Sequence, residues 1–215
     1  MRPRKLAAWL ALVGVLAALN YAGRFSSGKP PKDALYQWNT AISGIVFYAF
    51  MLGLVLAIAR GLSWAELGVR RPASWPRALG FTAAVLIGLL VAEALLESVL
   101  HGAREQGLEP AHWEPSKAAQ FAANAAVVAL AAPFVEELTF RGVGFRLLAP
   151  LATALAVVGT SAAFAADHGL VEGFLALFIF GLGVALVRLH TGSIFPGMLL
   201  HACFNGFALL TAIAR

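Results

Sequence analysis

Charge is scarce in this chain of 215 residues. Only 13% of the side chains are Asp, Glu, Lys or Arg, against about a quarter in an ordinary soluble domain. Apolar residues make up 60%, and no charged residue occurs from Leu6 to Ala22 or from Ile42 to Ala59. A soluble fold of this length must show water a mostly polar surface. The composition therefore excludes an ordinary soluble domain and favours lipid as the solvent.

Cysteine and several protease motifs are also scarce or missing. Cys203 is the only cysteine, which excludes an internal disulfide and a thiolate metal cluster. A bound metal would need His and carboxylate ligands. The sequence has no HExxH, no GxGD paired with a second membrane aspartate and no GxSxG, and Ser161 and Ser193 follow Gly-Thr and Thr-Gly. These absences disfavour serine and aspartyl mechanisms.

Long apolar runs dominate what is present. With about 20 apolar residues needed for each crossing, the sequence predicts an all-α polytopic bundle of about seven, six to eight, transmembrane helices. We expect helices near residues 6–23, 41–59, 78–100, 118–147, 151–167, 170–190 and 193–213. The chain forms one integral membrane domain in two parts, 1–117 with mostly apolar spans and 118–215 with ionisable residues inside its spans.

The net charge of +5 reports topology rather than a nucleic-acid partner, because the basic residues lie at segment ends and not along one amphipathic face. They are concentrated before the first span and in the link after the second (Arg2, Arg4, Lys5, Arg60, Arg70, Arg71, Arg77). The link holding Arg104, Glu105, Glu109, Glu114 and Lys117 is net acidic. The positive-inside rule then places the N-terminus and the Arg60 to Arg77 link in the cytoplasm.

Two adjacent acids and an arginine interrupt the fourth span. Glu137 and Arg141 are four residues apart and share a helix face, whereas Glu136 points about 100° away. This spacing predicts that Glu137 is neutralised locally and that Glu136 is left free. The alternative is a purely structural buried ion network of both acids and the arginine.

Two histidines and an asparagine lie near the ends of later spans. Phe164 and His168 share one face of the fifth span, and His201 and Asn205 share one face of the seventh. Asp167 is expected to meet water at a helix end. Because Ser193 is only eight residues before His201, the last helix must start deep in the bilayer, or the site must lie in an open cavity. Each residue alone could also be structural.

Together these residues suit the activation of water. A turn at Ala149 and Pro150 would fold the fourth and fifth helices into a hairpin, with a tilt or a kink at Pro133 bringing Glu136 and His168 to one depth. A carboxylate and an imidazole in a low-dielectric pocket can serve as general base, and His201 and Asn205 could donate to an oxyanion.

A zinc site is the alternative chemistry. Glu136, His168 and His201 form the His₂Glu donor set of a hydrolytic zinc site. Both routes end in amide hydrolysis, so the pattern itself leaves the choice between them open.

Three motifs in this order resemble those of the CPBP (Abi) family, which includes the type II CAAX prenyl proteases. EELTFR from Glu136 matches EExxxR, FAADH from Phe164 matches FxxxH, and HACFN from His201 matches HxxxN. The resemblance covers roughly residues 118–210, including the approach Thr191 to His201. It implies a glutamate-dependent endopeptidase that cuts peptides at or within the membrane.

Carried over by position, the resemblance assigns a role to each motif residue. Glu136 and His168 would activate water, and His201 and Asn205 would stabilise the oxyanion. Glu137 and Arg141 would hold the site in shape, with Phe164 supporting it. Members have been described as metalloproteases and as metal-independent glutamic proteases, so a divalent metal such as Zn²⁺ stays open, with Glu136, His168 and His201 as its ligands.

The expected partner is a membrane-anchored protein or peptide in the bilayer, with a C-terminal tail or sorting signal as the expected cleavage region, and no nucleic acid is expected. The small, alanine-rich chain is typical of a protein of the bacterial inner membrane. Two other functions fit the composition: a non-catalytic bacteriocin-immunity or scaffold protein, and a small transporter that uses its intramembrane acids and histidines.

Overall fold

The computed structural model describes residues 2–27, 33–100, 105 and 113–213, and every regular element in that part is helical. The longer helices are α1 (Pro3–Ser27), α2 (Trp38–Ala59), α3 (Trp75–Leu100), α8 (Thr153–Asp167), α9 (Phe174–Thr191) and α10 (Phe195–Ile213). Two short 3₁₀ turns, η1 (Ala34–Tyr36) and η2 (Pro115–Lys117), join them. The predicted all-α polytopic bundle is confirmed. Arg104 and Glu109 of the acidic link lie outside the described residues.

One helix is built from five consecutive segments. They are α5 (Ala118–Ala126), η3 (Val127–Ala131), α6 (Ala132–Glu137), η4 (Leu138–Gly144) and α7 (Phe145–Leu148), and η3 and η4 are π-helical. A turn then leads into α8, which gives the predicted hairpin, and α7 packs against α8.

Six helices in the described part of the chain are long and apolar enough to cross a membrane. They are Pro3–Ser26, Trp38–Ala59, Trp75–Leu96, Pro115–Leu148, Phe174–Thr191 and Phe195–Ile213. The seventh predicted helix is present as α8, but its 15 residues extend only about 22 Å, less than the roughly 30 Å hydrocarbon core. The protein is an integral membrane protein.

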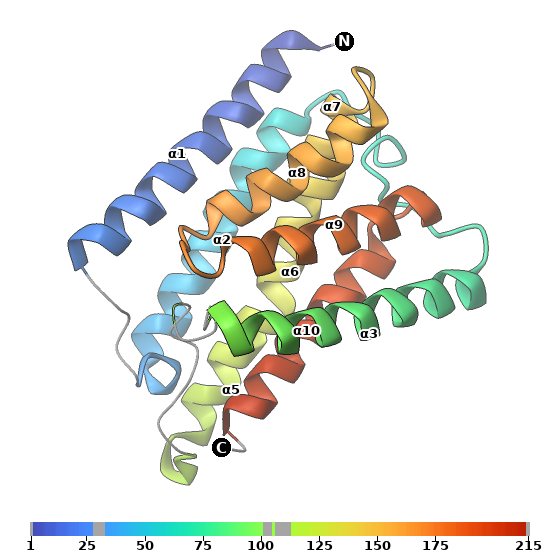
Figure 1. Ribbon diagram of the computed structural model, residues 1–215. Helices are drawn as coiled ribbons and strands as arrows, with labels where there is room; N and C mark the ends of the chain where they lie inside the picture. Colours follow the sequence, from blue (N-terminus) through green and yellow to red (C-terminus); the bar gives the residue numbers. More distant parts are fainter. Residues whose placement is uncertain (1, 28–32, 101–104, 106–112, 214–215) are drawn as a thin grey trace.

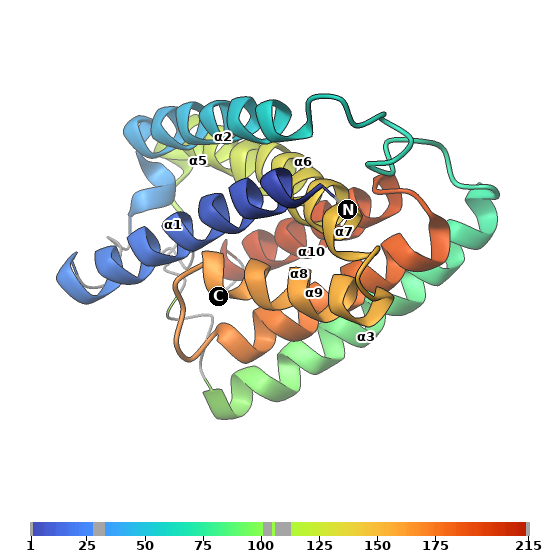
Figure 2. The same ribbon diagram turned by 90° about the horizontal axis from the view of Figure 1, so that it is seen from above.

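The helices form layers around the segmented helix and α10 (Figures 1 and 2). Helices α1 and α2 lie on one side of this pair, and α3 lies on the other side, against α9 and α10. Helix α8 packs most extensively against α9 and also contacts α1. The outer helices expose large apolar side chains such as Phe50 on α2 and Ile87 on α3, as expected for surfaces that face lipid.

Helix α1 is held close to the segmented helix by Trp9. This buried indole donates its Nε1–H to the Thr139 carbonyl at 3.0 Å, and its ring lies over Gly144. A Cβ atom at position 144 would collide with the Trp9 ring. Glycine at this position therefore permits the two helices to approach closely.

Basic side chains hold the N-terminal end of α1 to the C-terminal end of α2. Arg2 donates to the Gly61 carbonyl at 2.6 Å, and Lys5 donates to the Ile58 and Arg60 carbonyls at 2.7 and 2.6 Å. These contacts place the first basic cluster beside the basic link, as the charge pattern predicts.

The start of α10 is attached to the same link and lies inside the protein. The Ile194 N–H donates to the Gly68 carbonyl at 2.9 Å, and the Ser193 hydroxyl donates to the Arg70 carbonyl at 2.6 Å. Ser193 and Ile194 are buried. The last helix therefore starts within the bundle, which explains how His201 reaches the level of Glu136 within two turns.

Candidate active site

The two glutamates lie between two π-helical segments. The Ala132 N–H donates to the Val127 carbonyl, five residues back, and α6 then carries Pro133, Glu136 and Glu137 before η4 begins at Leu138. Proline lacks an N–H and its ring crowds the carbonyl four residues before it. The wider π turn ahead of Pro133 accommodates both effects, so the predicted irregularity at Pro133 takes the form of a π segment. Such segments are frequent at functional sites.

Glu137 and Arg141 form the predicted ion pair, fully buried within the bundle. Arg141 Nη1 lies 3.1 Å from Glu137 Oε1, and neither side chain is exposed. Arg141 Nη2 donates to the Gly181 carbonyl of α9 at 2.9 Å, and its guanidinium lies 4.7 Å from the centre of the Phe164 ring. The pair links the segmented helix to α9 and is packed on Phe164.

His201 lies between the two carboxylates. Its Nδ1 is 3.1 Å from Glu137 Oε1, and its Nε2 is 3.7 Å from Glu136 Oε2. An ionised carboxylate only accepts hydrogen bonds, so Nδ1 carries the proton that it donates to Glu137. That contact turns Nε2 toward Glu136. Glu137 therefore orients the imidazole as well as neutralising Arg141.

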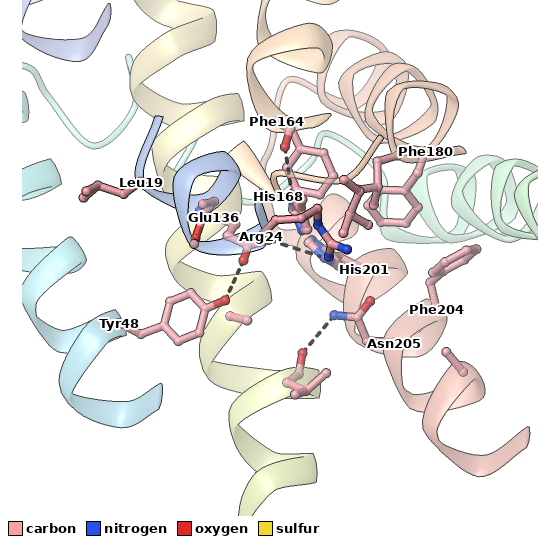
Figure 3. A pocket seen from close by; sticks show the side chains of 17 residues that line it. Leu19, Arg24, Tyr48, Glu136, Phe164, His168, Phe180, His201, Phe204 and Asn205 are labelled. Atoms are coloured by element: carbon pink, nitrogen blue, oxygen red, sulfur yellow. Dashed lines mark hydrogen bonds and ion pairs between the residues drawn. The ribbon is translucent and has the colours of Figure 1, made fainter. Parts of the chain in front are cut away.

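Glu136 has a partner that the motif spacing did not predict. The Tyr48 hydroxyl of α2 donates to Glu136 Oε1 at 2.7 Å, and Figure 3 shows the two side chains facing each other. The expectation that Glu136 is free is therefore wrong: it lacks an arginine, but Tyr48 and His201 flank its two oxygens. The phenol is the only one in α2, and an isolated phenol in an apolar span was the signal available in the sequence.

His168 and Asn205 complete the polar lining. His168 Nδ1 bonds with the Phe164 carbonyl at 2.8 Å, and the two rings lie 4.6 Å apart. Asn205 Nδ2 donates to the Val128 carbonyl of η3 at 2.8 Å (Figure 3). An amide NH₂ has two hydrogens, so one N–H of Asn205 remains beyond this bond.

These side chains surround one pocket of about 500 Å³. Glu136, His168, His201 and Asn205 line it, with Phe164 in its wall. Apolar residues of α1, α9 and α10 complete the lining, among them Leu19, Leu177, Phe180, Phe204 and Ala208. Glu137 and Arg141 lie behind this lining and do not contribute to it. The structure thus brings together the four residues predicted to be catalytic.

Asp167, by contrast, is not where the sequence pattern placed it. We expected contact with water at the end of α8, but the residue is 9% exposed, and Oδ1 has no hydrogen-bond partner in the described structure. Its carbonyl accepts a hydrogen bond from Asn20 of α1. The close packing of α1 over the end of α8 covers this carboxylate.

The donor set does not fit a metal in this arrangement. Across residues 2–27, 33–100, 105 and 113–213, no group of three or more His, Cys, Asp or Glu side chains is placed to hold a metal ion. Both nitrogens of His201 face carboxylates, and Nδ1 of His168 is bonded to a carbonyl. We derive no step through a metal, and metal dependence stays a prediction.

Comparison with known families places the site within one matched segment. Residues 118–207 match the family model described as Rce1-like, type II CAAX prenyl endopeptidase Rce1-like. This segment, called the Rce1-like segment below, is similar to that family. The Rce1-like segment holds every motif residue from Glu136 to Asn205 and confirms the predicted resemblance to CAAX-type proteases. The comparisons with curated proteins and with solved structures gave no match.

Part of the pocket comes from outside the Rce1-like segment. Tyr48 of α2 and Leu19, Asn20 and Arg24 of α1 line the pocket, although they precede residue 118. The N-terminal helices therefore complete the site as well as anchoring it in the membrane.

Proposed function

We propose that this protein is an intramembrane endopeptidase that hydrolyses a peptide bond of a membrane-anchored protein or peptide. One observation carries the proposal: a carboxylate, two imidazoles and an amide line a single pocket inside a bundle of apolar helices. The Rce1-like segment supports the same reaction class.

The chemistry begins with a water molecule beside Glu136 and His168. Glu136 accepts a proton from the water as its oxygen adds to the peptide carbonyl carbon. The remaining N–H of Asn205 donates to the oxyanion, and His201 donates through Nε2 in its imidazolium form, in which both ring nitrogens carry a proton. Such an interaction is often worth about 10²–10³ in rate. The C–N bond then breaks, and the proton held by Glu136 passes to the leaving amine. The reaction thus consumes one water molecule and produces one carboxyl group and one amine.

Tyr48 in the pocket wall and the ion pair behind the wall hold the reacting groups in place. Tyr48 fixes one oxygen of Glu136, and the Arg141 and Glu137 pair fixes the ring of His201. Because a misplacement of about 1 Å can lower a rate by about 100-fold, these residues act by positioning. We assign them no contact with the substrate.

We further propose that the substrate is cut near a C-terminal tail or sorting signal, in the bacterial inner membrane. Comparative mass spectrometry of membrane-protein C-termini tests this, using cells with the wild type or Glu136→Gln. We expect one or more tails to be longer in the variant. Glu66→Gln, which alters a partly exposed acid remote from the pocket, serves as the matched control and should leave the tails unchanged.

This experiment and an uptake assay together separate the alternatives. If no tail changes length with Glu136→Gln and the biological activity is retained, the non-catalytic immunity or scaffold function is favoured. Proton-driven uptake in proteoliposomes that survives replacement of Asn205 would support the transporter function instead.

A further inference from the structure

The pocket extends from Glu136 toward one end of the bundle only. On the segmented helix it is lined by Glu136, then by Ala132 and Val128, one and two turns toward α5. In the opposite direction every residue of η4, Leu138–Gly144, is buried. Since η4 contributes no residue to the pocket lining, the pocket runs from Glu136 toward the α5 end.

The other helices line the pocket toward the same end. Helix α10 contributes His201 and then residues toward its C-terminus, as far as Ala208. Helix α8 contributes Phe164 and His168 at its C-terminal end, and Leu170 follows. Helix α1 contributes Leu19, Asn20, Gly23 and Arg24, also near its C-terminal end. The opening consequently lies where α1, α8 and α10 end and where α5 begins.

Charge distinguishes the two ends of the bundle. The end with the N-terminus of α1 and the Arg60 to Arg77 link carries mostly basic described residues (Arg2, Arg4, Lys5, Arg60, Arg70, Arg71, Arg77, Arg146, Arg188), with Glu66 as its acid. The end with the pocket opening carries four described acids (Asp33, Glu105, Glu114, Glu172) beside Arg24 and Lys117. With Lys29, Lys32 and Arg104 of the adjoining sequence included, it still has fewer Lys and Arg than the other end. Arg24 itself is paired with Glu105 at 3.3 Å.

We propose that the pocket opens on the noncytoplasmic side of the membrane. An excess of Lys and Arg marks cytoplasmic ends, and the pocket opens at the opposite end. The substrate class follows: membrane-anchored polypeptides whose scissile bond is exposed outside the cytoplasm, rather than lipid-modified tails in the cytoplasm. This substrate assignment rests on the proposed peptidase function, whereas the side of the opening does not.

Cysteine labelling tests the side of the opening without any activity. Cys203→Ser provides a background without thiols, since Cys203 is the only cysteine. Gly23→Cys places a thiol in the pocket lining, where an added Cβ meets nothing within 4 Å. Ala73→Cys is the matched control in the exposed basic link. A membrane-impermeant maleimide is applied to intact spheroplasts and to lysed ones.

We expect Gly23→Cys to be labelled in intact spheroplasts as fully as in lysed ones, and Ala73→Cys to be labelled only after lysis. The reverse pattern overturns the proposal. The tails that lengthen with Glu136→Gln give a second readout, because they should all lie outside the cytoplasm, and cytoplasmic tails would contradict the substrate class. If no tail lengthens, the peptidase proposal fails, while labelling still decides the side of the opening.

Discussion

Removing Arg141 from its buried ion pair should destabilise the fold far more than removing a partly exposed charge such as Arg146. The side chains of Arg141 and Glu137 form an ion pair in which neither is exposed. Arg141→Met therefore leaves Glu137 as a buried carboxylate without its counter-charge. Breaking a buried ion pair in this way costs about 3–5 kcal/mol. For a chain of this size each kcal/mol corresponds to about 2–4 °C, so the melting temperature should fall by roughly 10 °C.

The assay is thermal unfolding of the detergent-purified protein, followed by the fluorescence of its five tryptophans. The double variant Glu137→Gln/Arg141→Met removes both charges, and glutamine can still accept from His201, so most of the lost stability should return. The matched control is Arg146→Met, five residues along the same helix, whose partner Glu66 is partly exposed. Its effect should be a small fraction of that of Arg141→Met. If Arg141→Met melts like the wild type, or the double variant melts like the single one, the reasoning is refuted.

Four further predictions follow from single contacts. Tyr48→Phe removes a hydrogen bond to Glu136, and a bond to a charged group contributes about 1.5–3 kcal/mol, so kcat should fall roughly tenfold or more with KM little changed. Gly181→Ala places a methyl group 3.0 Å from Ser161 Cα of α8, and overpacking of this kind costs about 1–3 kcal/mol in the free energy of unfolding. The Ser63 N–H, followed by Arg146, lowers the pKa of Glu66 from 4.5 to about 2. The Glu66 carboxylate therefore contributes its full stabilisation above about pH 4.5 and loses it as pH falls through about 2. The difference in melting temperature between the wild type and Glu66→Gln should accordingly disappear toward pH 2. EDTA should leave cleavage by the purified protein unchanged, because the described donors bond with one another.

Two of these four predictions have a control variant, and the other two have an outcome that would contradict them. Tyr36→Phe removes a hydroxyl that accepts a hydrogen bond from the Glu114 N–H outside the pocket lining and should retain kcat, so equal losses in both variants would contradict a positioning role for Tyr48. Gly53→Ala on α2 meets nothing within 4 Å and should not destabilise the protein, unlike Gly181→Ala. If the difference in melting temperature between the wild type and Glu66→Gln stays constant from pH 6 to pH 2, the pKa argument is contradicted. Activity lost in EDTA and restored by Zn²⁺ would instead support the zinc alternative.

Local geometry explains what could be predicted from the sequence. The Glu137 to Arg141 contact depends only on a four-residue spacing along one helix, and the hairpin depends on the turn at Pro150. The apolar runs likewise fixed the positions of the helices, because each run must match the thickness of the bilayer. These features need no knowledge of how distant segments pack.

Long-range packing explains what was missed. Tyr48 reaches Glu136 across 88 positions of the chain, and no periodicity in α2 marks that phenol as part of a site. The depth of His201 depends on bonds from Ser193 and Ile194 to a link more than a hundred residues earlier. The burial of Asp167 depends on the path of α1. In each case a second helix decides the outcome, and its position is not encoded by local spacing.

The π segment η3 determines which deletions the proposed activity should tolerate. A π turn holds one residue more than an α turn, so removing one residue from Val127–Ala131 would restore ordinary α winding and leave Glu136 facing Tyr48. An α-helix turns by about 100° per residue, so removing one residue from the α-helical stretch 132–135 would instead turn Glu136 away from Tyr48. Two deletions with nearly the same effect on hydropathy should therefore differ sharply in their effect on the proposed hydrolysis.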